Sequence, residues 1–170
     1  MDREPLISVL TTFHNAERTV VKTVRSLLDQ DYKNFEHILV NDGSNDNSVK
    51  IIKEVSDKRM ILLEPGRVGR AEALNHGLNK ARGKIVAILD ADDLSLFNRL
   101  TEQKKQFDED PNVTLVCANA VLIDENGALQ GKTKFPVNHE DLVESLMKLN
   151  PFPHSSVMFL RKSAQVVCLL

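Results

Sequence analysis

The sequence predicts an α/β fold, in which a mainly parallel sheet carries helices on both of its faces. Short apolar segments rich in Ile, Val and Leu alternate with longer segments whose apolar residues recur every three or four positions. The first pattern is typical of buried strands, and the second of amphipathic helices. The chain of 170 residues suits one domain and has no internal repeats. Such alternation favours parallel strands joined by helical crossovers.

In the first half of the chain, each predicted strand is followed by a predicted helix. The order is a strand over 7–12, a helix over 20–28, a strand over 35–40, a helix over 49–55, a strand over 60–63 and a helix over 71–81. Asn15 is the predicted N-cap of the first helix, and Pro65-Gly66 breaks the third strand. Gly83 is predicted to end the third helix in the usual C-terminal manner.

The second half continues the pattern with longer spacings. The order is a strand over 84–89, a helix over 99–107, a long strand over 113–123, a helix over 139–149 and a strand over 156–160. Asp124-Glu125-Asn126-Gly127 is a hairpin turn signal after the long strand. A loop is expected at Asn150-Pro151-Phe152-Pro153 because two prolines interrupt it.

A cluster of carboxylates follows directly on the apolar run Ile85–Leu89. Asp90, Asp92 and Asp93 repel one another, so the cluster persists most easily when a cation neutralises it. Mg²⁺ and Mn²⁺ prefer carboxylate oxygens and often bridge to substrate phosphates. The alternative is an acidic turn that caps the next helix, because Asp is a good N-cap. This stretch alone favours neither reading.

Several polar residues are predicted to meet at one edge of the sheet. Thr12, Asp42 and Asp90 end three strands, Asp92 follows Asp90, and Arg70 opens a helix. In open α/β sheets, ligands bind beyond the carboxyl ends of the strands. Asp42 could accept hydrogen bonds from a nucleobase or ribose, Arg70 could pair with a phosphate, and Asp92 could hold a metal. The set therefore predicts a site for a nucleoside diphosphate and a divalent ion.

Each of these residues also has an ordinary structural interpretation. Asp42-Gly43-Ser44 is, taken alone, more typical of a tight turn than of a binding site. Arg70 could be a solvated residue at a helix start, although the helix dipole disfavours a cation there. Thr12 is weak support by itself. The prediction depends on the coincidence of Asp42, Arg70 and the carboxylates at one edge.

Composition excludes several classes of partner. Lys and Arg number 22 against 24 Asp and Glu, and the net charge of -2 gives no reason to expect a nucleic-acid partner. No apolar run approaches the ~20 residues of a transmembrane helix. The first five residues lack the apolar region of a signal peptide, and Cys117 and Cys168 form neither a metal spacing nor a disulfide framework. We expect a cytoplasmic protein, with peripheral association with the inner face of the membrane left open.

The sequence resembles the inverting glycosyltransferases of family 2, which have the GT-A nucleotide-sugar fold. The resemblance runs from about Leu6 to about Lys162, and its motifs lie at 7–17, 38–46, 69–77, 81–84 and 88–93. The last motif is Ile-Leu-Asp-Ala-Asp-Asp. The segment 153–162, Pro-His-Ser-Ser-Val-Met-Phe-Leu-Arg-Lys, is similar to one in bacterial members that build surface polysaccharides.

The resemblance implies a role for each candidate residue. Thr12 and Asp42 would contact the nucleobase and ribose, and Arg70 would lie near the base or the diphosphate. Asp90 would face the ribose and the metal, and Asp92 would ligate Mg²⁺ or Mn²⁺ directly. The family transfers a sugar from a nucleotide-sugar donor, here expected to be a UDP-sugar, to a glycan or lipid-linked acceptor. The reaction inverts the anomeric carbon, and the implied role is cell-surface polysaccharide synthesis.

Two departures from the family pattern matter. Thr12 and His14 stand where many relatives carry Pro and Tyr. No Asp or Glu follows Glu144, whereas the family's general base comes after the 153–162 segment, so the catalytic base is unknown. We therefore expect residues 1–170 to form a single GT-A domain that is incomplete at its C-terminus. The alternative is a sugar-nucleotide-binding module without the general base.

One further expectation concerns self-association, and three other enzyme classes are disfavoured. The apolar tail of residues 164–170 could drive self-association. A phosphatase with a nucleophilic Asp-x-Asp would carry it after the first strand, whereas here the acidic cluster lies in the middle of the chain. A nucleotidyltransferase would carry a Gly-rich loop near residues 13–16, which contain no Gly, and a Rossmann dehydrogenase would carry Gly-x-Gly-x-x-Gly, which is absent.

Overall fold

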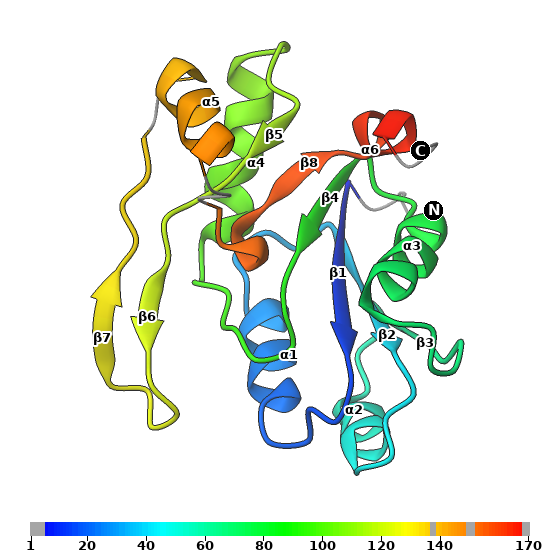
Figure 1. Ribbon diagram of the computed structural model, residues 1–170. Helices are drawn as coiled ribbons and strands as arrows, with labels where there is room; N and C mark the ends of the chain where they lie inside the picture. Colours follow the sequence, from blue (N-terminus) through cyan, green and yellow to red (C-terminus); the bar gives the residue numbers. More distant parts are fainter. Residues whose placement is uncertain (1–5, 137–138, 149–151, 168–170) are drawn as a thin grey trace.

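A six-stranded sheet forms the centre of the computed structural model, which describes residues 6–136, 139–148 and 152–167 (Figure 1). Its strands, in spatial order, are β3 (Met60–Leu63), β2 (Phe35–Asn41), β1 (Ile7–Phe13), β4 (Ile85–Ile88), β8 (Met158–Leu160) and β5 (Leu115–Val116). The first four are parallel, and β8 is antiparallel to both of its neighbours. The predicted mainly parallel sheet is confirmed.

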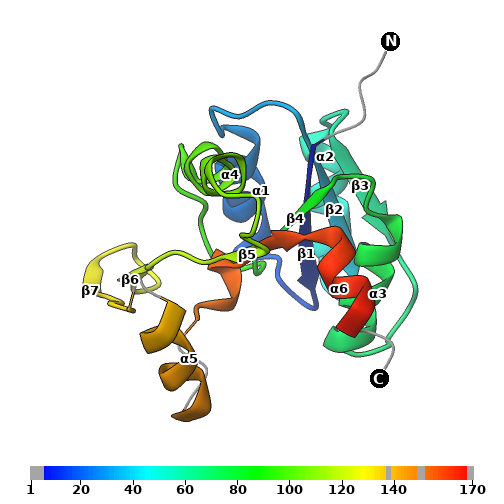
Figure 2. The ribbon, with the colours of Figure 1, turned by 90° about the horizontal axis from the view of Figure 1, so that it is seen from above.

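Helices cover both faces of this sheet, as predicted. The helices in the described part of the chain are α1 (Val20–Leu28), α2 (Ser48–Val55), α3 (Arg70–Lys80), α4 (Arg99–Glu109), α5 (His139–Lys148), α6 (Arg161–Val167) and the 3₁₀ turn η1 (His154–Ser156). Of these, α5 lies to the side of the sheet rather than over one of its faces (Figure 1, Figure 2). Figure 2 shows α1 and α4 on one side of the sheet and α3 on the other. None of the helices in the described part of the chain is long and apolar enough to cross a membrane.

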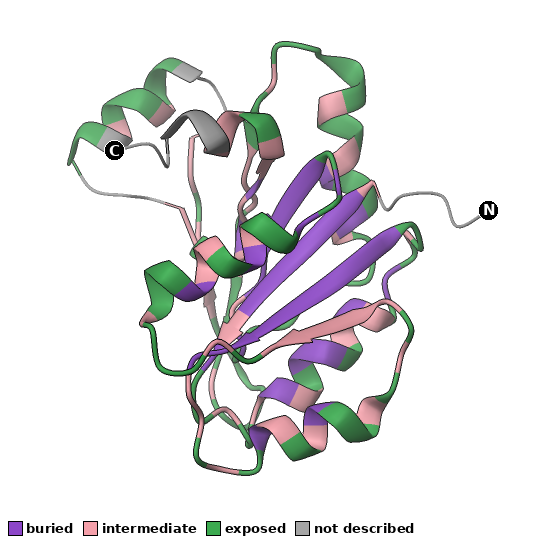
Figure 3. Cartoon of the chain, turned by 90° about the vertical axis from the view of Figure 1, so that its right-hand side faces the viewer, coloured by how far each residue is buried: buried purple, intermediate pink, exposed green. Residues whose placement is uncertain are grey.

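Alternation along the strands explains this arrangement. In β1, Ile7 and Val9 pack with Leu27 of α1 and Leu100 of α4, whereas Leu10 faces α3. The inner strands are therefore buried on both faces (Figure 3). Strands of this kind read as continuous apolar runs, which is why their positions follow from the sequence.

The predicted long strand over 113–123 is wrong. The chain forms the short strand β5 in the main sheet, then leaves it and pairs β6 (Val121–Ile123) with β7 (Leu129–Lys132) in a separate two-stranded sheet. The Ala118 N–H donates to the Ser156 hydroxyl at 3.2 Å, which holds the chain at the point where it departs. The hairpin turn before Gly127 is confirmed, with φ of 83° at that glycine.

Two helix boundaries also differ from the prediction. Asn15 is not the N-cap of α1, because the helix begins at Val20 and its N-cap is Thr19. Asn15 instead has a left-handed backbone, and its Oδ1 accepts the Asn45 N–H at 2.9 Å. Gly83 does not cap α3, because Ala81 is already extended. Gly83 packs against β1 instead, where an added Cβ would lie 2.6 Å from the Ser8 nitrogen.

The remaining differences are small. The last predicted strand, over 156–160, begins two residues later because η1 precedes it. The loop predicted over 150–153 begins outside the described residues. The apolar tail proposed for self-association, residues 164–170, has its side chains beyond Ala164 outside the described part of the chain.

Candidate functional site

The carboxyl ends of β1, β2 and β4 lie side by side, and the predicted site residues gather there. Thr12 lies in β1 beside Val40 of β2. It is therefore close to the carboxyl end of β2, which Asp42 directly follows. Asp90 lies two residues beyond β4, and Arg70 is the first residue of α3. The structure brings Arg70 and Asp90 into contact, and it places Asp42 in a separate network nearby.

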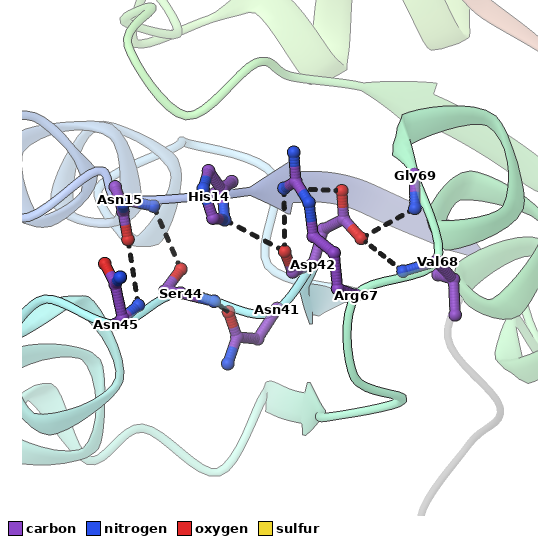
Figure 4. Close-up of polar contacts among 9 residues, drawn as sticks. All are labelled: His14, Asn15, Asn41, Asp42, Ser44, Asn45, Arg67, Val68 and Gly69. Atoms are coloured by element: carbon purple, nitrogen blue, oxygen red, sulfur yellow. Dashed lines mark hydrogen bonds and ion pairs between the residues drawn. The ribbon is translucent and has the colours of Figure 1, made fainter.

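Asp42 is the most heavily bonded residue of the site (Figure 4). Its Oδ1 accepts the N–H groups of Val68 at 2.7 Å and Gly69 at 2.8 Å, and its Oδ2 accepts Arg67 Nη1 at 3.0 Å. Its backbone carbonyl accepts Arg67 Nη1 at 2.9 Å and His14 Nδ1 at 3.0 Å. The carboxylate is 7% exposed. Asp42 therefore ties the end of β2 to the loop before α3.

These contacts determine the charge state of Asp42. Burial by itself would raise the pKa of the carboxyl, but the N–H groups of Gly69 and Val68 and the Arg67 guanidinium outweigh burial and lower the pKa. The carboxylate is therefore ionised at neutral pH. The turn depends on Gly43, which has φ of 69° and whose added Cβ would lie 2.9 Å from Arg67 Cβ.

The loops that follow β1 and β2 are bound to each other by reciprocal hydrogen bonds. Asn15 donates its N–H to the Ser44 hydroxyl at 3.0 Å and receives the Asn45 N–H at 2.9 Å, and Ser44 N–H donates to Asn41 Oδ1 at 2.8 Å (Figure 4). Asp46 Oδ2 accepts a further N–H from the first loop at 3.0 Å. These hydrogen bonds do not involve the Asp42 carboxylate.

Arg70, Asp90 and His154 form the second cluster of the site. Arg70 Nη2 donates to Asp90 Oδ1 at 2.7 Å, and His154 Nδ1 lies 3.1 Å from the same oxygen and 2.9 Å from Arg70 Nη2. Because one ring nitrogen cannot donate and accept together, His154 serves Asp90 when that nitrogen is protonated and Arg70 when it is not. The Asp90 N–H donates to the Ser155 hydroxyl at 2.9 Å, so η1 is attached to the acidic turn.

Asp90 is held ionised by its neighbours. Burial would raise the pKa of its carboxyl, but the hydrogen bond and charge of His154 and then the Arg70 guanidinium outweigh burial and lower the pKa. Asp92 and Asp93 are exposed beside it. Behind the turn, the half-buried Arg99 donates to the Ile88 carbonyl at 3.0 Å. Desolvation lowers the pKa of its guanidinium to about 10, against the opposing charge of Asp93.

The acidic turn suits a hard divalent ion in combination with phosphate. Among the described residues, no three carboxylate, histidine or cysteine side chains converge closely enough to hold a metal by themselves. Mg²⁺ is commonly bound by one or two carboxylates together with substrate phosphates, and Asp90 and Asp92 offer that donor set. The 26% exposure of the Asp90 side chain leaves it accessible from solvent.

Sequence reasoning missed Arg67, His154 and Ser155 as members of the site. Arg67 lies between Gly66 and Gly69, which both have positive φ. An arginine in a glycine-containing loop next to the predicted site could have indicated its role from the sequence. His154 and Ser155 reach Asp90 across more than 60 residues of chain, and no local pattern indicates that contact. His37 lies away from the site; it is fully buried, and its Nε2 lies 3.0 Å from the Thr11 hydroxyl.

Comparison with known proteins agrees with this geometry. Residues 8–166 match the family described as Glycosyl transferase family 2. The chain is 33% identical over 168 residues to "Putative glycosyltransferase EpsE" of Bacillus subtilis, covering 96% of this chain and 59% of that protein. It is 33% identical over 132 residues to "UDP-Glc:alpha-D-GlcNAc-diphosphoundecaprenol beta-1,3-glucosyltransferase WfgD" of Escherichia coli, covering 77% of this chain and 51% of that protein.

A solved structure confirms the fold. The mannosyltransferase PcManGT from Pyrobaculum calidifontis, in complex with GDP-Man and Mn²⁺, superimposes with a TM-score of 0.71 over 97% of this chain and 47% of its own, at 21% identity. The chain spans about half the length of the curated relatives it matches. It has the GT-A fold, and it belongs to glycosyl transferase family 2.

Proposed function

We propose that this chain binds a nucleotide-sugar together with Mg²⁺ or Mn²⁺, as the donor-binding domain of a glycosyltransferase. The supporting observation is the cluster at the carboxyl edge of the sheet, where the Arg70 guanidinium lies 2.7 Å from Asp90 and Asp92 stands exposed next to it. A cation for a diphosphate and carboxylates for a divalent ion are what a sugar nucleotide needs.

Within this proposal each residue has a role that family membership suggests. Thr12 and Asp42 lie at the nucleobase and ribose end, and Arg70 pairs with the diphosphate. Asp92 and Asp90 hold the divalent ion, which when bound neutralises charge on the departing diphosphate. UDP is the first candidate because the E. coli relative is named for a UDP-sugar, and GDP is the second because the P. calidifontis structure contains GDP-Man.

The proposed reaction is transfer of the sugar to a glycan or lipid-linked acceptor, with inversion at the anomeric carbon. The name of the E. coli relative, which states a diphosphoundecaprenol-linked acceptor, supports the lipid-linked alternative. We propose a role in surface polysaccharide synthesis from the resemblance of the 153–162 segment. A lipid-linked acceptor would place the protein at the cytoplasmic face of the membrane, as a peripheral protein. We assign no catalytic base among the described residues.

The first test is a thermal-unfolding panel with UDP and GDP, each with and without Mn²⁺. A nucleotide at 100 times its Kd should stabilise the fold by about 2.7 kcal/mol. We expect EDTA to remove most of that stabilisation, because the carboxylates hold the diphosphate through the metal. An unfolding transition that no nucleotide moves, with or without Mn²⁺, would show that the site is wrongly assigned.

The second test replaces the proposed metal ligand. Asp92→Asn keeps the side-chain shape but removes the charge that the ion needs, so Mn²⁺-dependent UDP affinity should fall by more than about tenfold while stability barely changes. Asp29→Asn, at an exposed position after α1, removes the same charge away from the site and should leave binding unchanged. Calorimetry measures both variants. Full affinity in Asp92→Asn would transfer the ligand role to Asp93.

A further inference from the structure

The loop before α3 is anchored to the rest of the protein at one residue. Between described residues, the hydrogen bonds that residues 65–69 make outside their own loop and α3 all go to Asp42. Gly66 and Gly69, with φ of 91° and 87°, lie near the two ends of the loop, and an added Cβ would meet nothing within 4 Å at either. The loop therefore has a glycine with free space around it near each end, and the Asp42 residue holds it to the rest of the protein.

The loop leads directly into Arg70. The Gly69 N–H, bonded to Asp42 at 2.8 Å, belongs to the residue immediately before Arg70, whose guanidinium reaches Asp90 at 2.7 Å. Any shift of the loop therefore moves the start of α3 and changes the direction of the Arg70 side chain. The position of Asp42 determines where this cation stands relative to the acidic turn.

Little of the Asp42 carboxylate is left for a ligand. A carboxylate has about four acceptor positions, and Oδ1 already accepts two N–H groups while Oδ2 accepts Arg67. With the side chain 7% exposed, at most one position on Oδ2 remains. A direct contact with the nucleobase is compatible with this geometry, but it cannot be the main use of the carboxylate.

We infer that Asp42 is a positioning residue: it fastens the 65–69 loop, and through that loop it holds Arg70 in place to grip the donor diphosphate. This inference rests on the proposed function, because it concerns how strongly the site binds the diphosphate. It differs from a direct contact to the base in one measurable respect. Positioning acts on every ligand that carries a diphosphate, whereas a base contact acts only on ligands that carry the base.

Inorganic pyrophosphate with Mn²⁺ is the base-free probe. Asp42→Ala should weaken binding of UDP and of pyrophosphate by a similar factor of about ten, the cost of losing one charge-assisted hydrogen bond from Arg70. Removing a nearby negative charge would by itself strengthen binding of an anion, so a loss of pyrophosphate affinity has no simple electrostatic explanation. Arg70→Ala sets the scale of the loss. Weakened UDP binding with unchanged or tighter pyrophosphate binding would overturn the inference.

Hydrogen exchange without ligand provides a second measurement that does not depend on the proposed function. Asp42→Ala should speed exchange at the Val68 and Gly69 amides by about tenfold or more, because both lose their acceptor. Asp42→Asn, which keeps one oxygen acceptor, should speed it less. Asp46→Ala loosens the neighbouring loop and should leave these two amides unchanged. If exchange at Val68 and Gly69 does not change in Asp42→Ala, the inference fails even when UDP binds.

The two measurements separate the possible failures. A wild-type chain that binds neither UDP nor pyrophosphate contradicts the proposed function, and exchange at Val68 and Gly69 still decides whether Asp42 fastens the loop. Arg67→Gln is the control in case Asp42→Ala misfolds. It removes the Arg67 contacts with the Asp42 carboxylate at 3.0 Å and carbonyl at 2.9 Å, and it keeps the Val68 and Gly69 N–H groups bonded to Asp42. It should produce a smaller change of the same direction in both experiments.

Discussion

Strand β2 carries a buried carboxylate at each end, and the two carboxylates have similar hydrogen-bond partners. At its amino end, Glu36 accepts the Ser8 hydroxyl at 2.7 Å and the Arg82 N–H and Nε at 2.8 Å each. At the carboxyl end, Asp42 accepts two loop N–H groups and Arg67. The side chains are 3% and 7% exposed, and each pairs with an arginine whose side chain is about 60% exposed.

The two ends differ in the freedom of the chain segment that each carboxylate binds, which is the segment at 82–83 for Glu36 and the 65–69 loop for Asp42. At the amino end, Gly83 packs so closely that an added Cβ would lie 2.6 Å from the Ser8 nitrogen, which leaves no room for a ligand or for movement. At the carboxyl end, the captured loop has open glycine hinges and leads into Arg70. The same chemistry therefore closes the fold at one edge and positions a binding group at the other, where α/β sheets bind ligands.

The largest expected effect comes from Glu36→Ala. It leaves the Ser8 hydroxyl and the Arg82 N–H without an acceptor beside a packed strand, and should cost about 3 kcal/mol of unfolding free energy. Asp42→Ala should cost less, because the 65–69 loop can open and its N–H groups can bond to water. Urea denaturation measures both. Equal losses of stability at the two positions would refute the distinction between the two ends of β2.

The second prediction concerns His37, which lies next to Glu36 in β2. Its ring is fully buried, and its Nδ1 has no hydrogen-bond partner among the described residues. Burial, followed by the charge of Arg59, lowers its pKa to about 3. The unfolded chain binds a proton near pH 6.5 and the folded chain does not, so stability is complete above that pH and falls as pH decreases toward 3. The expected slope is about 1.4 kcal/mol per pH unit.

Between pH 7 and pH 5 most carboxyl groups stay ionised, and subtracting the profile of a His37 variant removes the contribution of the other four histidines. By pH 5 the loss should reach about 2 kcal/mol. His37→Gln keeps a polar group for Thr11 and should flatten the profile. A wild-type profile that is already flat over this range would mean that the ring takes up a proton in the folded protein.

The smallest expected effects come from glycine substitutions at the two ends. Gly83→Ala places a Cβ against the backbone of β1 and should cost about 1–2 kcal/mol of stability, as overpacking does, with UDP affinity unchanged. Gly43→Ala forces an unfavourable φ and presses on Arg67, so it should cost about 1 kcal/mol and also weaken UDP binding. Loss of UDP affinity in Gly83→Ala would contradict the comparison.

The sequence predicted β1, β2 and β4 closely, because strands buried on both faces are continuous apolar runs. The prediction from the sequence failed at β5, the strand at the edge of the main sheet. The segment 113–123 has strand composition throughout, but composition does not say which sheet a strand joins, and the chain divides it between two sheets. Asn15 and Gly83 were misassigned for a similar reason, because each has the residue type of a helix cap and is used in a contact between loops or strands.

What the sequence determined by itself is the edge of the sheet at which the site lies. Alternating strands and helices imply parallel strands, and parallel strands bring Thr12, Asp42 and Asp90 to one edge. Only the tertiary structure decided the partners of these residues. His154 reaches Asp90, and the 65–69 loop reaches Asp42, through contacts between segments far apart in the chain. Such contacts depend on the paths of the loops, which leave no local pattern in the sequence.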